Sequence, residues 1–197
     1  MADSGRSTQA LPASAREAEV LQALAWQDAA WPWAAYGPGV MSAVRAGVPV
    51  LGANLPRGEM AAHMADTSLD QRLPPAAWAA QEQAIRDGHC DLLPPAQITP
   101  MTRIQIGRDM RMARETGAAL QLAKPGQLVV LISGSAHADK SLGVPRHLPA
   151  SVRVTAVRFL AGDAALPGEQ FDSVLSTPPV PAQDHCAALR LQFKRSS

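Results

Sequence analysis

The chain has 197 residues, of which 47% are apolar, and its 18 basic and 17 acidic side chains give a net charge of +1. A chain of this length suits one domain that buries a sizeable core without a metal or a disulfide. The balanced charge argues against nucleic acid as a partner and against a polybasic membrane-binding patch.

Residues 1–14 are small, polar and proline-containing, which predicts a disordered tail ahead of one domain over residues 15–193. The N-terminal residues lack the apolar run of a secretory signal peptide, and no stretch is long and apolar enough to cross a bilayer. The sequence as written therefore predicts a cytoplasmic protein.

The first half of the domain is helical in composition. Ser14 and Glu17 have the spacing of a capping box and predict a helix over 14–26. Pro38 and Gly47 are expected to begin and end a second helix. Three further segments have helical composition, namely 56–66, 74–88 and 98–123, the last of them weakened at Gly107.

Four short apolar segments predict strands, at 48–55, 127–133, 152–159 and 171–176. The segment 127–133 is apolar almost throughout, as in a strand buried on both faces, and the last two segments partly alternate. Helices interleaved with such strands are typical of an α/β fold with a mainly parallel sheet flanked by helices. Four strands nevertheless make a thin sheet.

His137 lies just past the predicted strand 127–133, and ligands bind at the carboxyl ends of strands in open parallel sheets. The small residues 133–136 before it allow a tight turn and a close approach to a ligand. From spacing alone, His137 is either a ligand-binding residue or a loop histidine that bonds to the backbone. No neighbouring serine is marked as a nucleophile.

Arg108 lies in the middle of an apolar stripe on the predicted helix 98–123. A buried guanidinium must be paired, so Arg108 either joins an internal ion pair or binds an anionic ligand. Asp109 lies on a neighbouring face of the helix, where it is available as a partner for another strand or loop.

His89 and Tyr36 are further candidates with a structural alternative. His89 follows the helix-ending Gly88, where the helix dipole favours a cation, so it serves either the helix end or a pocket. Tyr36 is the only tyrosine and lies near two tryptophans, which suits a core cluster or an axial ligand of haem iron.

Two cysteines, Cys90 and Cys186, are far apart in the sequence and are expected to be unpaired thiols in a reducing compartment. A bridge between them is plausible only for an exported protein. The sequence contains no HExxH or CxxC motif, so it does not support a self-contained zinc site.

Several segments in this order resemble the ChaN-like haem-binding proteins of the Tiki superfamily: GVPVLGANLPR (47–57), GHCDLLPPAQITPMTRIQIGRDMRMA (88–113), LVVLISGSAHADKSLGVPRHLP (128–149) and TPPVPAQDHCAALR (177–190). The resemblance implies an α/β domain with a helical subdomain. It also implies haem binding in bacterial haem or iron uptake, a homodimer with tyrosine ligation, and a transport system as partner. By the same resemblance, relatives are expected to be exported or membrane-anchored. The residues expected to contact haem are His137, Gly134, Tyr36, His89 and Arg108.

Distant members of the superfamily are metal-dependent hydrolases whose site combines an early GExH-like motif with a late GxxH motif. Residues 134–137, Gly-Ser-Ala-His, match the late motif, and the early one has no counterpart here. The chain is therefore expected to lack the N-terminal part of the family domain and to be a binding protein rather than an enzyme. The alternative is a hydrolase that holds a divalent metal ion at His137. A third expectation is a nonfunctional fragment.

Overall fold

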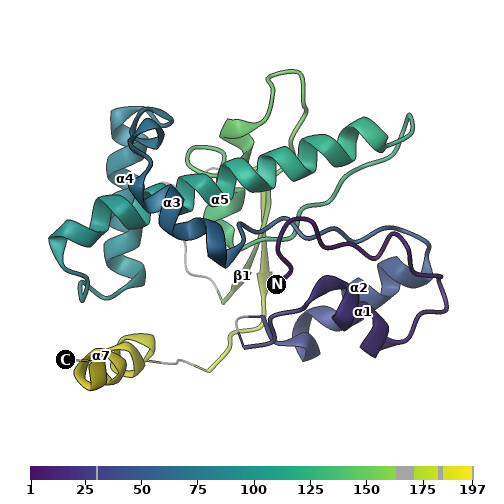
Figure 1. Ribbon diagram of the computed structural model, residues 1–197, viewed down its shortest axis with the longest axis horizontal. Coiled ribbons are helices and arrows are strands. Elements are labelled where there is room, and N and C mark those ends of the chain that lie inside the picture. Colours follow the sequence, from purple (N-terminus) through teal and green to yellow (C-terminus); the bar gives the residue numbers. More distant parts are fainter. Residues whose placement is uncertain (30, 163–170, 182–183, 197) are drawn as a thin grey trace. The chain divides into compact units, whose positions relative to one another are not determined.

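The computed structural model describes residues 1–29, 31–162, 171–181 and 184–196 (Figure 1). The chain forms two compact units. Unit 1 contains Met1–Glu59 and Arg111–Val130, and unit 2 contains Met60–Met110 and the chain from Leu131 onwards. The sequence predicted one domain over 15–193, and the division into two units differs from that expectation.

Helix α1 (Glu17–Leu24) begins later than predicted. The backbone N–H of Arg16 donates to the Glu19 carboxylate over 2.7 Å. The cap therefore uses Arg16 and Glu19, and the prediction of a cap at Ser14 was wrong. The pairs Ser14–Glu17 and Arg16–Glu19 have the same spacing. With the helix starting at Glu17, Val20 and Leu24 of α1 are buried in the core of unit 1. That core consists of Ala2, Ala15, Val20, Leu24, Met41 and Val44.

Helix α2 (Trp33–Arg45) contains Pro38 in its interior, so the prediction that the helix begins at Pro38 was wrong. The backbone N–H of Trp33 donates to the Asp28 carboxylate over 2.7 Å. An acidic side chain that accepts from a first-turn N–H stabilises a helix start at that place. The Asp28 carboxylate thus explains why the helix begins before the proline.

Residues 1–14 do not form the expected disordered tail, because Ala2 and Thr8 are buried. The segment runs beside the predicted strand 48–55, through isolated bridges that join Asp3 to Asn54 and Ser7 to Leu51. The segment 48–55 thus makes two single bridges, and the prediction of a sheet strand there was wrong. A Cβ on Gly52 would lie 2.0 Å from the Asp3 carbonyl oxygen, so this approach requires glycine.

Unit 2 is mainly helical and includes the first part of the long helix α5. Its α-helices are α3 (Met60–Ala65), α4 (Pro75–Gly88), α5 (Pro95–Leu122, in unit 2 as far as Met110), α6 (Ser135–Ala138) and α7 (His185–Ser196). It also contains the 3₁₀ turns η2 (Thr67–Gln71) and η3 (Val144–His147). A further 3₁₀ turn, η1 (Arg57–Glu59), lies in unit 1. One core cluster consists of Leu69, Leu73 and Ile106, with Ala77, Trp78 and Met110 packed against it. None of the described helices is both long enough and apolar enough to span a membrane.

The helix predicted over 74–88 is confirmed by α4, and α5 corresponds to the helix predicted over 98–123. Helix α5 continues through Gly107, so the expected weak point does not interrupt it. A Cβ on Gly107 would lie 2.2 Å from Cδ2 of His63. Glycine is therefore needed there for close packing of the His63 ring.

A bidentate ion pair between Arg103 and Asp70 joins α5 to η2. The Arg103 Nε donates to Asp70 Oδ1 over 2.7 Å and its Nη2 donates to Asp70 Oδ2 over 2.8 Å. Its Nη1 also donates to the Met64 carbonyl over 3.0 Å. The hydrogen bonds from Arg103, together with its charge, lower the pKa of the Asp70 carboxyl.

Arg103→Gln is expected to lower the free energy of unfolding at neutral pH by about 1–2 kcal/mol, because the pair is partly exposed. The pKa of Asp70 is lower in the folded state, so this contribution is present above about pH 4 and is lost as the pH falls through the lowered value. Urea denaturation at several pH values measures it. Arg103→Lys keeps the charge without the bidentate geometry and should retain part of the stability. An equal loss in the free energy of unfolding at acidic and at neutral pH contradicts the prediction.

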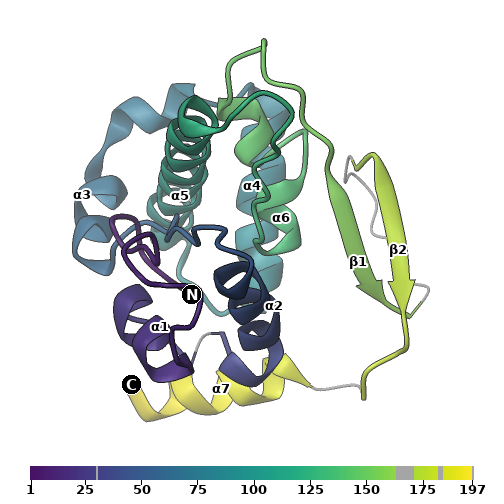
Figure 2. The same ribbon diagram turned by 90° about the vertical axis from the view of Figure 1, so that its right-hand side faces the viewer.

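The strands β1 (Val157–Ala161) and β2 (Ser173–Thr177) pair in parallel (Figure 2). The α/β class with a parallel sheet is confirmed, and both strands overlap the predicted segments 152–159 and 171–176. The segment 127–133 forms no strand, so the sheet of the described residues has two strands where four were predicted.

The absence of a strand at 127–133 has a physical reason. A strand needs a neighbour for its N–H and C=O groups, and a fully apolar strand also needs cover on both faces. Its alternate side chains Leu128, Val130 and Ile132 are instead 88%, 77% and 70% exposed.

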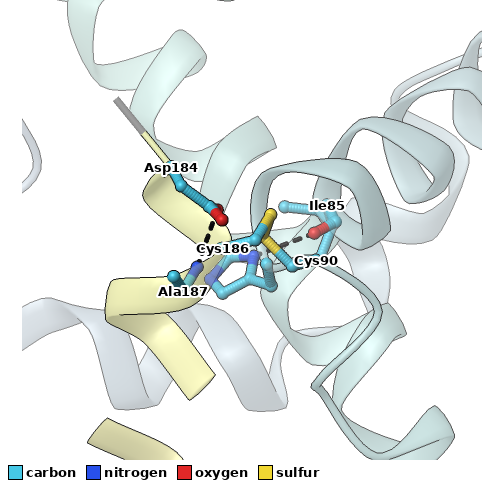
Figure 3. Close-up of a disulfide and its surroundings, with 6 residues drawn as sticks. Ile85, Cys90, Asp184, Cys186 and Ala187 are labelled. Atoms are coloured by element: carbon cyan, nitrogen blue, oxygen red, sulfur yellow. Dashed lines mark hydrogen bonds between the residues drawn. A yellow bond between two sulfur atoms is a disulfide. The ribbon is translucent and has the colours of Figure 1, made fainter. Parts of the chain in front are cut away.

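A disulfide joins Cys90, just after α4, to Cys186 in the first turn of α7 (Figure 3). The expectation of two unpaired thiols was wrong. The Asp184 carboxylate accepts the Ala187 N–H over 2.8 Å and caps α7 next to the bridge. Residues 96 positions apart are thus brought together by the tertiary fold.

Candidate functional site

Unit 2 contains a cavity of about 320 Å³ that is partly open to solvent. Its lining comes from α4, α5 and the segment that opens α6: Gln81, Ala84, Ile85, Gln105, Asp109, Gly134, Ser135, Ala136 and His137. The volume is at the lower end of the roughly 300–1,000 Å³ of small-molecule sites. Five of the nine lining residues are polar, so the cavity is more polar than the mostly apolar sites that are typical of small-molecule binding.

His137 and Asp109 form a hydrogen-bonded pair at this cavity. The His137 Nδ1 lies 2.6 Å from Asp109 Oδ1. The side chains are 17% and 3% exposed, respectively, so the carboxylate is almost completely withdrawn from water. Since Nδ1 is occupied by this bond, Nε2 is the ring nitrogen that remains for a ligand.

The backbone around His137 is tightly held. Gly134 is the N-cap of α6, and its carbonyl accepts the His137 N–H over 3.0 Å. Downstream, the Gly143 N–H donates to the Asp139 carbonyl over 2.8 Å. A Cβ on Gly143 would lie 2.3 Å from the His137 carbonyl oxygen, so the two backbone segments touch directly. The imidazole is therefore held by α6 and by the close turn that follows it.

Burial raises the pKa of the Asp109 carboxyl. The hydrogen bond with His137 and the charges of His137 and Arg108 act in the opposite direction and favour the ionised form. Arg108 is half-buried and is not among the residues that line the cavity, so the choice between an ion pair and an anionic ligand stays a prediction. Asp109 contacts His137 of α6, so it is a partner for another segment as predicted, but that segment is a short helix where a strand or loop was expected.

The structure brings together two of the predicted site residues, because Gly134 and His137 both line the cavity. His89 is not among the lining residues. It follows the last residue of α4, and its Nδ1 bonds to the Ile85 carbonyl over 2.8 Å. This contact agrees with the structural alternative for His89, a residue that completes the helix end.

Tyr36 lies in α2 of unit 1 and belongs to an aromatic cluster. Its ring centroid is 4.4 Å from that of Trp31 and 6.4 Å from that of Trp26. Trp26 in turn meets Trp33 edge to face, with centroids 5.1 Å apart. Tyr36 is half-buried in this aromatic cluster and does not line the cavity of unit 2.

Gln81 and Gln105 are cavity residues that the sequence analysis did not single out as site candidates. Gln81 is 5% exposed. The sequence did contain an indication that Gln81 is buried. Trp78, Gln81 and Ile85 share one face of α4, and Gln81 is the polar residue that interrupts this apolar face. Helical periodicity therefore marks Gln81 as a buried polar group.

A metal site is not formed by the described part of the chain. No three His, Cys, Asp or Glu side chains gather there in a way that could hold a metal ion. The hydrolase alternative, with a divalent ion at His137, therefore receives no ligand set from these residues.

Comparison with known proteins gave two matches. The profile of the family described as haem-binding uptake, Tiki superfamily, ChaN, matches residues 5–148, which include every cavity residue. The solved structure titled "Cofacial heme binding to ChaN of Campylobacter jejuni" is 23% identical with a TM-score of 0.64, and the match covers 80% of this chain. The chain spans 62% of that protein's chain, and the likeness shows a shared fold. A search of the curated proteins gave no significant match.

Proposed function

The chain belongs to the ChaN family of haem-binding uptake proteins in the Tiki superfamily, and from this premise we propose that it binds haem at the cavity lined by His137. The observation that carries the proposal is the His137–Asp109 pair, which holds an imidazole at the wall of a partly apolar cavity. Both residues lie within the segment that matches the family.

The cavity supplies both polar and apolar groups for contacts with part of a haem. His137 would offer its imidazole to haem iron, which proteins often bind through histidine. Ala84, Ile85 and Ala136 provide apolar contacts for the macrocycle, and Gln81 and Gln105 provide amide donors for propionates. When bound, haem supplies a redox-active iron, and the chain's residues bind and orient it.

Tyr36 is proposed as the second candidate ligand, because tyrosine also ligates haem iron. Its support is the chemistry of a lone tyrosine in an aromatic cluster. Haem titration of the His137→Ala and Tyr36→Phe variants compares the two ligands directly.

We further propose that the protein acts in haem or iron uptake as a homodimer that works with a transport system. The family description supports the uptake role. A cavity of about 320 Å³ holds part of a haem group, so a second copy of the chain is suited to cover the rest. The Cys90–Cys186 bridge favours an oxidising compartment, which departs from the cytoplasmic location expected from the sequence.

A haem titration of the purified chain, followed by absorbance, tests the function. A Soret band that saturates at one haem per chain or per two chains is expected. His137→Ala should weaken binding at least about tenfold, equivalent to about 1.4 kcal/mol. His89→Ala is the matched control, because His89 does not line the cavity, and it should leave binding unchanged. Loss of binding in Tyr36→Phe alone would move the site to Tyr36, and no saturable binding by the folded chain contradicts the function.

A further inference from the structure

We infer that the Cys90–Cys186 disulfide is a reversible redox site, at which a dithiol reductant detaches α7 from α4 and loosens the last turn of α4. This redox site goes beyond the proposed function, because it acts whether or not the cavity holds haem. Its tests need no haem, so they succeed or fail independently of the haem titration.

The bridge is the attachment of α7 to α4. Cys90 follows the end of α4, and Cys186 lies in the first turn of α7 (Figure 3). Within the described part of α7, no hydrogen bond or ion pair leads to another element. Both cysteines are half-buried, and most of the described side chains of α7 are exposed. The sulfurs are therefore within reach of a small dithiol, and breaking the bridge detaches the helix.

The bridge begins at an unfavourable backbone conformation. Cys90 and Asp91 have φ values of 56° and 55°, in the left-handed region that favours glycine. A residue with a Cβ stays in this region only when its surroundings hold it there, and such residues are common at switch regions. The bond to Cys186 is one such restraint on Cys90. Opening the bridge removes it and lets this segment relax to an ordinary conformation.

Two hydrogen bonds connect these left-handed residues to the last turn of α4. The Cys90 N–H donates to the Asp87 carbonyl over 3.0 Å, and the Asp91 N–H donates to the Arg86 carbonyl over 3.0 Å. Bonds of this kind depend on the left-handed turn that ends the helix, so they are lost when the turn relaxes. Arg86 directly follows Ile85, whose side chain lines the cavity. The cavity wall at Ile85 is therefore less firmly held in the reduced protein.

The reaction is thiol–disulfide exchange with a dithiol. A thiolate of the reductant attacks one sulfur of the bridge, and the other cysteine leaves as a thiolate that takes a proton from water. The second thiol of the reductant then displaces the remaining cysteine from the mixed disulfide. The bridge gains two electrons and two protons, and the dithiol is oxidised to a disulfide. A disulfide oxidant closes the bridge by the reverse exchange.

Hydrogen exchange tests the loosening of α4. Oxidised wild type, wild type reduced with dithiothreitol, and Cys186→Ser are compared under conditions in which circular dichroism shows all three folded. The backbone amides of residues 89–91 should exchange at least about tenfold faster in the last two, while amides earlier in α4 keep their protection. Dithiothreitol should not change Cys186→Ser, which controls for effects of the reductant elsewhere. Equal rates in oxidised and reduced wild type overturn the inference, and so does equal acceleration along the whole of α4.

The redox equilibrium with dithiothreitol tests the role of the left-handed turn. Asp91→Gly relieves the unfavourable conformation in the oxidised form, where the turn is held, and Asp91→Ala is the matched control that removes the same carboxylate but keeps a Cβ. Relative to Asp91→Ala, Asp91→Gly should shift the equilibrium towards the bridge about fivefold. This shift lowers the two-electron potential by about 20 mV, at about 30 mV per tenfold. Equal equilibria in the two variants show that the turn does not relax on reduction and overturn the inference.

Discussion

Replacing Cys90 by serine is expected to lower the free energy of unfolding by roughly 4–5 kcal/mol. The bridge closes a loop between residues 96 positions apart, and a loop of about 100 residues corresponds to about 4.7 kcal/mol in the chain-entropy model. The loss is large against the roughly 5–15 kcal/mol by which a typical domain is stable. The change is measured by urea or thermal denaturation of the oxidised wild type and the variant.

The design has an internal control, because the bridge needs both sulfurs. Cys186→Ser and the double variant should each match Cys90→Ser, and a reducing agent should bring wild type to the same stability. Reduction should also speed proteolysis of α7, most of whose described side chains are exposed. Equal stability of oxidised and reduced wild type, with no alkylation difference at the two thiols, contradicts the bridge.

Gly143→Ala is expected to be the most damaging change in the segment 134–143, which carries His137. A Cβ at this position would lie 2.3 Å from the His137 carbonyl oxygen, 2.5 Å from its carbonyl carbon and 2.7 Å from the Ala136 carbonyl oxygen. These are backbone atoms that cannot rotate away, so the segment itself must move. Overpacking of this kind costs about 3 kcal/mol of stability. Displacement of His137 should also weaken haem binding by at least about tenfold, or about 1.4 kcal/mol.

Gly134→Ala provides the matched control in the same segment. A Cβ there meets only Cδ2 of His137, at 3.9 Å, and the φ of Gly134 is −62°, which alanine adopts readily. Its effect on stability should stay within about 0.5 kcal/mol. Denaturation and haem titration of both variants make the comparison. A Gly134→Ala variant that loses more than Gly143→Ala contradicts this account of the segment.

Local and periodic features could be predicted from the sequence. The helix over 74–88 was found because proline and glycine mark its ends, and the long helix over 98–123 was found from its helical composition, despite the weak point expected at Gly107. The parallel strands near 157 and 173 were found from short apolar runs. Motifs in order pointed to the ChaN family, and the position of His137 after an apolar run pointed to the cavity.

Features that depend on a choice between equivalent local patterns were not predictable. Ser14 with Glu17 and Arg16 with Glu19 have the same spacing, and the packing of α1 decided between them. The segment 127–133 has the composition of a buried strand, yet strand formation depends on neighbours that a local pattern does not specify.

The amino-acid sequence by itself determined the family, the α/β class, the main helices and the candidate histidine. The tertiary structure alone decided which residues meet that histidine and each other. Asp109 and His137 are 28 positions apart, and Cys90 and Cys186 are 96 apart. Helical periodicity places Asp109 on a face of α5 but does not specify the segment that packs there. Which segment packs against that face depends on the packing of complete helices and loops, and this packing brings distant residues into contact.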